Sequence, residues 1–248
     1  MELKFPFDPI KRASDVEKIV MKGNSRLYYR FRPAPYYGGI STADAIGCSF
    51  LCPYCWNYDR NLNPKRFGKF FSPQAVASNL LRIAEEKSFN LFRVTGSEPI
   101  LGEVSFKHLI EVINAVFKKN ARFKFVIETN GLILGYRSDL IKYLKFPNLW
   151  VRIAIKGVDK NSFESISGAK KDFFLYPIKA VKELQKGHVK AWPAVMEDLF
   201  KDCDIESLKD ILRKENIKGN IELEKLERYP FVLNNMKKRE ITLKGHYQ

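Results

Sequence analysis

Short apolar segments alternate with amphipathic segments along most of this 248-residue chain. The apolar segments have the length of strands, and the segments between them repeat their apolar residues at helical spacing. Strand–helix–strand units repeated in this way build a parallel sheet, because each helix carries the chain back to the same end of the sheet. The expected strands are 41–47, 91–95, 123–128, 149–156, 188–195 and 220–226, and the expected helices are 73–87, 105–119, 137–145, 172–186 and 204–215.

Six such strands predict an α/β fold, a partial (β/α)6 barrel of parallel strands with short N- and C-terminal extensions. We expect one domain over 1–248, with its core at about 40–226, an extension over 1–40 and a tail over 227–248. The hydrophobic fraction of 45% is enough for one core and excludes a disordered chain. We find neither a signal-peptide pattern nor an apolar run of the roughly 20 residues that a membrane helix needs, so we expect a cytoplasmic protein without membrane contact.

Three of the four cysteines lie within eight residues, as Cys48, Cys52 and Cys55. A structural zinc site takes four ligands, and no fourth Cys or His lies close downstream. A disulfide framework is unusual in a cytosolic chain. An iron–sulfur cluster takes thiolates from a short loop, and three ligands leave one iron open for chemistry. Cys203 lies far along the chain and is expected to be a buried or bystander thiol.

Polar residues follow the expected strands at the end where such folds gather their chemistry. Gly96-Ser97-Glu98-Pro99 follows strand 91–95, and Glu128-Thr129-Asn130-Gly131 ends strand 123–128. The alternation along each strand also predicts which side chains face the inside of the barrel. These are Arg93, Thr95, Lys124, Glu128, Arg152, Lys156, His188, Lys190, Trp192, Glu222 and Glu224. An interior lined with charges favours an open barrel that holds an anionic or zwitterionic ligand.

The spacing C-x3-C-x2-C with Tyr54 before the last cysteine resembles the signature of the radical S-adenosylmethionine (radical SAM) superfamily. Together with the GSEP turn, the ETNG strand end and the VRIAIKG strand, the resemblance extends from about residue 40 to 226. It implies that Cys48, Cys52 and Cys55 hold a [4Fe-4S] cluster whose fourth iron binds S-adenosylmethionine (SAM). It also implies reductive cleavage of SAM to a 5′-deoxyadenosyl radical, which abstracts hydrogen from a substrate.

The resemblance further implies which residues contact SAM. The GSEP turn is similar to the GGEP motif of the superfamily, with Ser97 in place of the second glycine. The implied contacts are Gly96, Ser97 and Glu98 for the methionyl amine, Arg152 or Lys156 for the carboxylate, Glu128 and Asn130 for the ribose or methionyl end, and Tyr54 near the adenine. Alternatively, Arg152 and Lys156 pair with Glu222, Glu224 or Glu128 as structural ion pairs.

The formal charge of +15 favours a polyanionic partner, so an RNA substrate, typically tRNA, is one hypothesis. As a strand, segment 26–32 places Arg26, Tyr28, Arg30 and Arg32 on one face, and basic charge beside aromatic planes is typical of single-stranded RNA sites. The Cys55-Trp56 pair also looks similar to the loop of tRNA-wybutosine-synthesising radical SAM enzymes. Alternatively, the charge is general to a Lys-rich chain, and the segment is an amphipathic strand packed on the barrel.

Two other functions stay open at this point. The compact length and single cluster also fit an activating enzyme of the kind that installs a glycyl radical on a partner protein. A non-catalytic iron–sulfur or zinc module is the other alternative, which the SAM-site motifs disfavour. The radical SAM interpretation further implies an external electron donor such as ferredoxin or flavodoxin.

Overall fold

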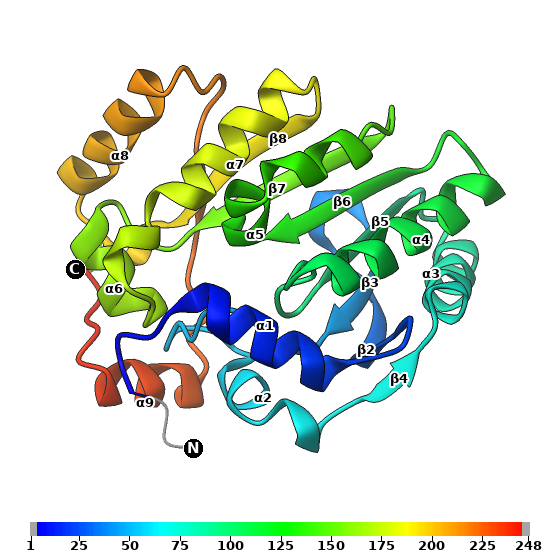
Figure 1. Cartoon of the computed structure of the whole chain (residues 1–248), viewed down its shortest axis with the longest axis horizontal. Coiled ribbons are helices and arrows are strands. Elements are labelled where there is room, and N and C mark those ends of the chain that lie inside the picture. The colour runs from blue at the N-terminus through cyan, green and yellow to red at the C-terminus, as the bar shows by residue number, and fades with distance from the viewer. Residues whose placement is uncertain (1–3, 245–248) are drawn as a thin grey trace.

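The computed structural model describes residues 4–244, and a mostly parallel sheet forms its centre (Figure 1). Six parallel strands follow one another across the sheet, and the two edges do not pair with each other. These strands are β3 (Ile40–Ala45), β5 (Leu91–Thr95), β6 (Lys124–Thr129), β7 (Leu149–Ile155), β8 (Lys190–Met196) and β9 (Glu222–Glu224). The prediction of a partial barrel with six parallel strands is therefore confirmed.

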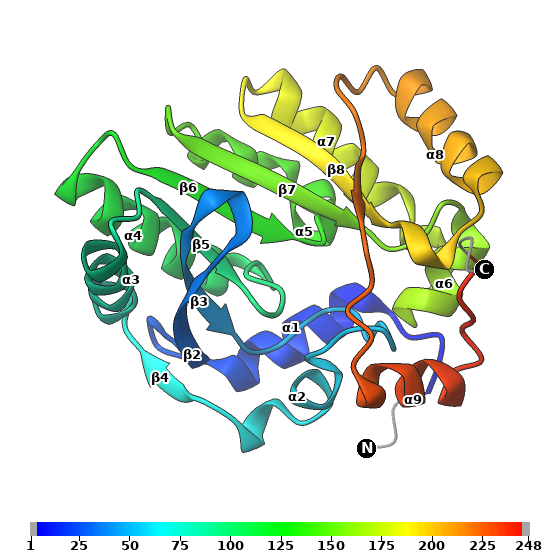
Figure 2. The same ribbon diagram turned by 180° about the vertical axis from the view of Figure 1, so that it is seen from behind.

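Helices cover one face of this sheet. In Figure 1, α4, α5 and α7 lie in front of strands β6–β8, and in Figure 2 they lie behind them. The connecting helices are α3 (Pro73–Lys87), α4 (Glu103–Lys119), α5 (Leu132–Tyr136), α6 (Lys160–Ser167), α7 (Leu175–Lys186) and α8 (Asp202–Lys214). Helix α3 begins as its sequence predicts, since Ser72 caps it by accepting a hydrogen bond from the Ala75 amide and Pro73 takes its first position.

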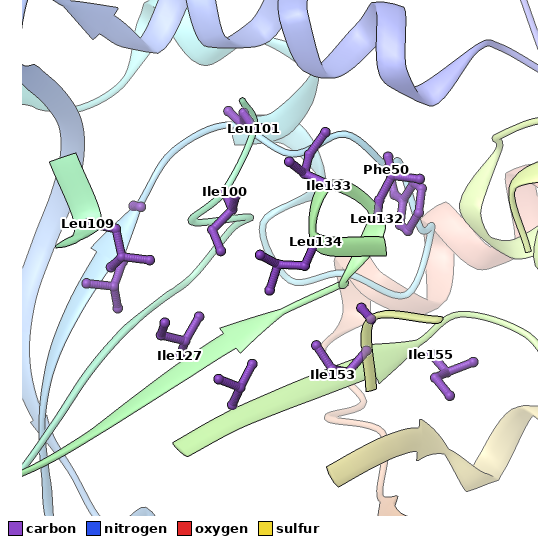
Figure 3. Close-up of a cluster of buried hydrophobic side chains, with 14 of the residues drawn as sticks. Phe50, Ile100, Leu101, Leu109, Ile127, Leu132, Ile133, Leu134, Ile153 and Ile155 are labelled. Atoms are coloured by element: carbon purple, nitrogen blue, oxygen red, sulfur yellow. The ribbon is translucent and has the colours of Figure 1, made fainter. Parts of the chain in front are cut away.

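The core fills the space between the sheet and these helices. Figure 3 shows a part of it, where side chains from β6 and β7 meet those of α4, α5 and the loops that follow the strands. The alternation along β7 is as predicted, because Val151, Ile153 and Ile155 are buried toward the helices. The opposite face of β7 carries Arg152, which leaves that face of the sheet free to line a cavity.

The N-terminal segment continues the sheet beyond the six parallel strands. Helix α1 (Pro9–Val20) leads through the short strand β1 (Met21–Lys22) into β2 (Ser25–Ala34). Strand β2 pairs antiparallel with β3, and β4 (Lys69–Phe71) pairs with β2 in turn. Residues expected as an extension outside the pattern therefore form one edge of the sheet.

The chain reaches the other edge of the sheet at its C-terminal end. In Figure 2 the segment that leads from α8 to α9 (Pro230–Lys238) runs across the face that the helices leave uncovered. Strand β9 is part of this segment. Residues 245–248 of the expected tail lie outside the described residues.

The expected helix over 137–145 is present only as a 3-10 helix, and the α-helix of this connection lies earlier in the chain. The chain turns helical directly after β6, as α5, and residues 138–143 form a separate 3-10 helix. Two features explain the shift. The apolar residues 132–134 are buried in the core, which fixes the first turn there. Gly135 allows α5 to lie against the backbone of Tyr176 in α7, where any side chain would collide.

Candidate active site

One cavity of about 1050 Å³ lies at the carboxyl ends of the parallel strands. Its walls come from the cysteine loop, the GSEP turn, the ends of β6 and β7, strand β2 and the segment 222–231. The structure brings every predicted site residue to this cavity. They are Cys48, Cys52, Tyr54, Cys55, Gly96, Ser97, Glu98, Glu128, Asn130, Arg152 and Lys156.

The cysteine loop presents its three thiols to the cavity, whereas Cys203 is exposed on α8. Protein N–H groups point at two of the sulfurs. The amides of Phe50 and Asn57 lie 3.4 Å from the Sγ atoms of Cys48 and Cys55, respectively. Burial raises the pKa of the Cys52 thiol to about 11, so a bound metal has to displace the proton.

This donor set fits an iron–sulfur cluster. Thiolates from a short loop are the usual cluster ligands, and N–H groups aimed at the sulfurs are the contacts that tune such clusters. Within residues 4–244, no three Cys, His, Asp or Glu side chains converge on the position of a single metal ion. A cluster does not require such convergence, because each of its thiolates binds a different iron.

The GSEP turn needs glycine at its first position. Gly96 has a φ of +85°, and a Cβ at this residue would lie 3.0 Å from the Cα of Asp44 on β3. Asn57 donates a hydrogen bond to the Gly96 carbonyl, and the Ser97 hydroxyl donates to the Asn61 side chain at 2.7 Å. The serine that departs from the GGEP motif is therefore accommodated by a hydrogen bond to α2 (Tyr58–Leu62).

Glu98 joins the GSEP turn to the end of β6. It is 3% exposed, and its carboxylate accepts hydrogen bonds from the Ile100 amide (2.9 Å), the Thr129 hydroxyl (2.6 Å) and the Asn130 amide (2.7 Å). Burial raises the pKa of Glu98 to about 7, although these donors act in the opposite direction. Glu98 thus holds the GSEP turn and the end of β6 at a fixed distance from each other.

Arg26 of β2 holds the same turn from the other side. Its guanidinium donates to the carbonyls of Glu98 (2.6 Å), Pro99 (2.7 Å) and Ile46 (3.4 Å). Sequence reasoning missed this role and placed Arg26 on an RNA-binding face. No local motif marks the residue, because its three partners lie 20 to 73 positions away in the chain.

The two polar residues at the end of β6 are held by neighbours. Asn130 donates to the Ser49 hydroxyl at 2.9 Å and lies 3.8 Å from the Cys48 sulfur. Glu128 accepts from Arg93 and Thr95, each at 2.7 Å. Although burial acts to raise the pKa of Glu128, the guanidinium groups of Arg93 and Arg152 lower it below its ordinary value.

Arg152 and Lys156 differ in their surroundings. Arg152 lies 3.0 Å from a carboxylate oxygen of Glu222 and 2.7 Å from one of Glu224, which confirms the structural pairing considered for it. Lys156 forms no ion pair with a carboxylate of the described residues, and its amine lies 5.4 Å from the ring centre of Tyr54. Of these two cations, Lys156 is the one available to a ligand carboxylate.

Strand β2 contains a bulge that divides its polar residues between two faces. The pairing with β3 shifts register between Tyr28 and Arg30. Tyr28 points to the helices, where its hydroxyl lies 3.0 Å from Nε2 of His108. Arg30 and Arg32 instead line the cavity. The prediction that Arg26, Tyr28, Arg30 and Arg32 share one face is therefore wrong.

Four residues predicted to line the interior of the barrel do not line the cavity: Lys124, His188, Lys190 and Trp192. The first three lie at or before the starts of their strands, away from the carboxyl ends. Lys124 and Lys190 both stand over the ring of Trp150, at 5.3 and 4.1 Å. His188 is exposed and has a φ of 59°, and it precedes the first residue of β8 by two positions.

Residues 45–214 match the family model of the radical SAM superfamily. The match spans more than half of the chain, so the protein belongs to this superfamily, which uses a [4Fe-4S] cluster and S-adenosylmethionine. No curated protein matches the chain. No helix within the described residues is long and apolar enough to span a membrane.

Several solved structures share the fold. Native anSMEcpe with bound AdoMet is 16% identical, with a TM-score of 0.55 over 75% of this chain and 53% of that one. Streptococcus suis SuiB bound to S-adenosylmethionine is 15% identical, with a TM-score of 0.58 over 82% of this chain and 42% of that one. The chain thus spans about half the length of these two proteins. At such low identity, the likeness shows the fold alone.

Proposed function

We propose that this protein is a radical SAM enzyme. The observation that carries the proposal is the meeting of the three-cysteine loop, the GSEP turn, Asn130 and Lys156 around one cavity. Cys48, Cys52 and Cys55 would hold the [4Fe-4S] cluster. The chemistry that the cluster and SAM supply when bound is reductive cleavage of the sulfonium to a 5′-deoxyadenosyl radical, which abstracts hydrogen from a substrate.

The chain's own residues bind and orient SAM in this proposal. Lys156 takes the carboxylate, because the other candidate cation, Arg152, already has two carboxylate partners. The GSEP turn and its buried Glu98 face the ammonium, and a cation there favours the ionised form of that carboxyl group. Tyr54 lies next to Lys156 and forms the wall for the adenine. The electron comes from a small redox protein such as ferredoxin or flavodoxin.

RNA is the substrate that we propose, with tRNA as the usual form. The chain carries a formal charge of +15, which attracts polyanions. Arg30, Arg32 and Arg60 line the cavity on one side, beside the aromatic rings of Tyr29 and Trp56. The two edges of the sheet do not pair with each other, which supports a proposed entry for the nucleotide from the side of the barrel.

The test is the rate of 5′-deoxyadenosine formation by anaerobically reconstituted, reduced protein. Small RNA from the source organism is added either intact or after ribonuclease digestion. We expect intact RNA to raise the rate well above that of SAM alone, and digested RNA to have no effect. A rise with a protein fraction and none with RNA would instead support the activating-enzyme alternative and contradict an RNA substrate.

A further inference from the structure

Five side chains form one wall of the cavity that the proposed SAM site does not use. This arginine wall consists of Tyr29, Arg30 and Arg32 on β2, and Trp56 and Arg60 after the cysteine loop. The bulge in β2 turns Tyr29 and Arg30 together toward the cavity. The wall therefore depends on a local irregularity that brings two consecutive residues to the same face.

The arginine wall has a surplus of positive charge. Asp44 is completely buried, and a single oxygen, Oδ2, accepts hydrogen bonds from Nε of both Arg30 and Arg32, each at 2.8 Å. One carboxylate thus faces two guanidinium groups. Arg60 adds a third, which donates to the Asn57 side chain and forms no ion pair with a carboxylate of the described residues. The net charge is about +2, so the wall attracts an anionic group.

Aromatic rings hold two of these guanidinium groups, those of Arg30 and Arg60, in place. Arg60 stands 4.6 Å from the ring centre of Tyr29, and Arg30 stands 5.5 Å from Tyr29 and 5.4 Å from Trp56. The rings of Tyr29 and Trp56 meet edge to face at 6.3 Å. Fixed guanidinium forks bind phosphate oxygens well, and guanidinium and indole planes both stack on nucleobases. The arginine wall therefore offers contacts both for the phosphate and for the base of a nucleotide.

The cavity has room for a ligand beside SAM. Its volume of about 1050 Å³ is slightly above the roughly 300–1,000 Å³ typical of small-molecule sites. The arginine wall lies on β2 and on the residues after the cysteine loop, and the opposite side of the cavity contributes Glu222, Glu224 and Glu227. Because Glu222 and Glu224 are paired with Arg152 and Lys225 lines the cavity together with Glu227, this side is close to neutral and offers an anion no surplus of positive charge. The charge distribution therefore directs the anionic part of a substrate to β2.

We infer that the arginine wall is the nucleotide subsite of the substrate. It would bind one unit of single-stranded RNA, with a backbone phosphate on Arg30 and Arg32 and the base against Trp56. This inference rests on the proposed function, because it presumes that the cavity holds the substrate of the radical reaction. It adds the residues that read the substrate and the side of the cavity from which the RNA enters.

The test measures binding of a fluorescently labelled, short single-stranded RNA to the reconstituted protein by anisotropy at several salt concentrations. We expect Arg30→Gln or Arg32→Gln to weaken binding about tenfold and to reduce the slope of log Kd against log salt by about 1. Arg30→Lys should restore part of the affinity. Arg82→Gln, an exposed position on α3 paired with Glu86, is the matched control and should bind like the wild type.

Folding is checked separately by thermal melting. Arg30→Gln leaves Asp44 paired with Arg32, so the buried carboxylate keeps a partner. Trp56→Ala tests the stacking contact, and we expect weaker binding with an unchanged salt slope. Unlabelled RNA, mononucleotide and inorganic phosphate are then compared as competitors for the labelled RNA. We expect unlabelled RNA to compete best, because the proposed ligand is an RNA chain and not a free nucleotide.

Two results would overturn the inference. One is wild-type affinity in both arginine variants, and the other is an acidic peptide that competes as well as RNA. The formation of 5′-deoxyadenosine from SAM alone is measured in the same preparations. If the wild type cleaves SAM while the variants bind RNA normally, the nucleotide subsite fails and the radical SAM proposal stands. If no preparation cleaves SAM, the proposed function itself fails.

Discussion

Arg26 is a buried charge whose partners are all backbone carbonyls. The residue is 1% exposed, and it links β2 to the start of the cysteine loop through Ile46 and to the GSEP turn through Glu98 and Pro99. Hydrogen bonds from a charged donor are stronger than neutral ones, and buried carbonyls without a donor are costly. Arg26 therefore couples stability to the geometry of the proposed SAM site.

The hydrogen bonds of Arg26 should contribute measurably to the free energy of unfolding. Arg26→Met should lower the free energy of unfolding by about 2–4 kcal/mol, because three buried carbonyls lose their donor. Arg26→Lys should cost less, since it keeps the charge and part of the hydrogen bonding. Urea denaturation measures both, with Arg82→Met as the exposed control expected within about 0.5 kcal/mol of the wild type. Equal stability of Arg26→Met and the wild type would contradict this role.

His108 gives a prediction on pH. Its Nδ1 lies 2.8 Å from the Asn24 carbonyl and must donate to it, so Nε2 accepts from the Tyr28 hydroxyl. Burial lowers the pKa of His108 from 6.5 to about 4. The unfolded chain therefore binds the proton more readily, and stability is full above pH 6.5 and is lost as the pH falls toward 4.

Between pH 7 and pH 5 this group should cost the wild type about 2 kcal/mol of unfolding free energy. His108→Gln removes the titrating ring, so urea denaturation at the two pH values should show a loss smaller by that amount. Tyr28→Phe keeps the ring buried and should keep the pH dependence. The same loss in the wild type and in His108→Gln would show that the burial of His108 does not contribute.

Lys156 is the residue that we expect to dominate SAM affinity. Lys156→Gln removes the cation proposed for the SAM carboxylate, and loss of a charged hydrogen bond costs about 1.5–3 kcal/mol. Equilibrium dialysis of the reconstituted protein should show a Kd for SAM raised at least about tenfold. Lys190→Gln is the control, since Lys190 lies on the same sheet over Trp150 but outside the cavity. Equal losses in both variants would point to general charge instead.

At the scale of elements, local sequence signals predict most of the parallel sheet. Strand 91–95 and helix 73–87 agree with β5 and α3 in both bounds, because apolar periodicity and an N-cap mark them locally. The position of α5, Leu132–Tyr136, was not predictable in this way. Its true start depends on the close approach of Gly135 to α7, which is a tertiary contact.

The site follows the same division. The cysteine loop, the GSEP turn and the end of β6 carry motifs, and the structure places them together. The faces of β2 could not be predicted, since a bulge between Tyr28 and Arg30 reverses the alternation that periodicity assumes. The strand expected over 220–226 is present as β9, but the sequence left open whether Arg152 pairs with Glu222 and Glu224 or binds a ligand, since that choice depends on tertiary contacts.

Strand β9 is held to the sheet by side chains as well as by its backbone pairing with β8. Arg152 is buried, and its pairs with Glu222 and Glu224 fasten β9 to the sheet together with a hydrogen bond from Trp192 to Glu222. Glu222→Gln/Glu224→Gln leaves the guanidinium without a partner charge from β9. We expect hydrogen exchange of residues 221–226 to speed up at least about tenfold, with little change in β5 and β6.

Glu206→Gln is the control for this experiment, because Glu206 forms an exposed ion pair with Lys209 on α8. It should leave the exchange of 221–226 unchanged. Unchanged exchange in the double variant would mean that backbone pairing with β8 is enough to hold β9.

At the scale of the whole molecule, the open sheet places unlike edges on the two sides of one cavity. Strand β2 and the residues after the cysteine loop form the arginine wall on one side, and the segment 222–231 contributes carboxylates and exposed aromatic rings, including Tyr229 and Phe231, on the other. The cysteine loop and the strand ends lie between them. A substrate that enters from the side therefore meets a basic edge before it reaches the proposed cluster.

The central claim is that the three cysteines and the cavity beside them support radical SAM chemistry. The most direct measurement is the release of 5′-deoxyadenosine from SAM by anaerobically reconstituted, reduced protein, compared with Cys52→Ala and with Cys203→Ala, which changes the exposed cysteine on α8. We predict release by the wild type and by Cys203→Ala, and loss of both the cluster and the product in Cys52→Ala. A wild-type protein that binds the cluster and SAM but releases no 5′-deoxyadenosine would contradict the account.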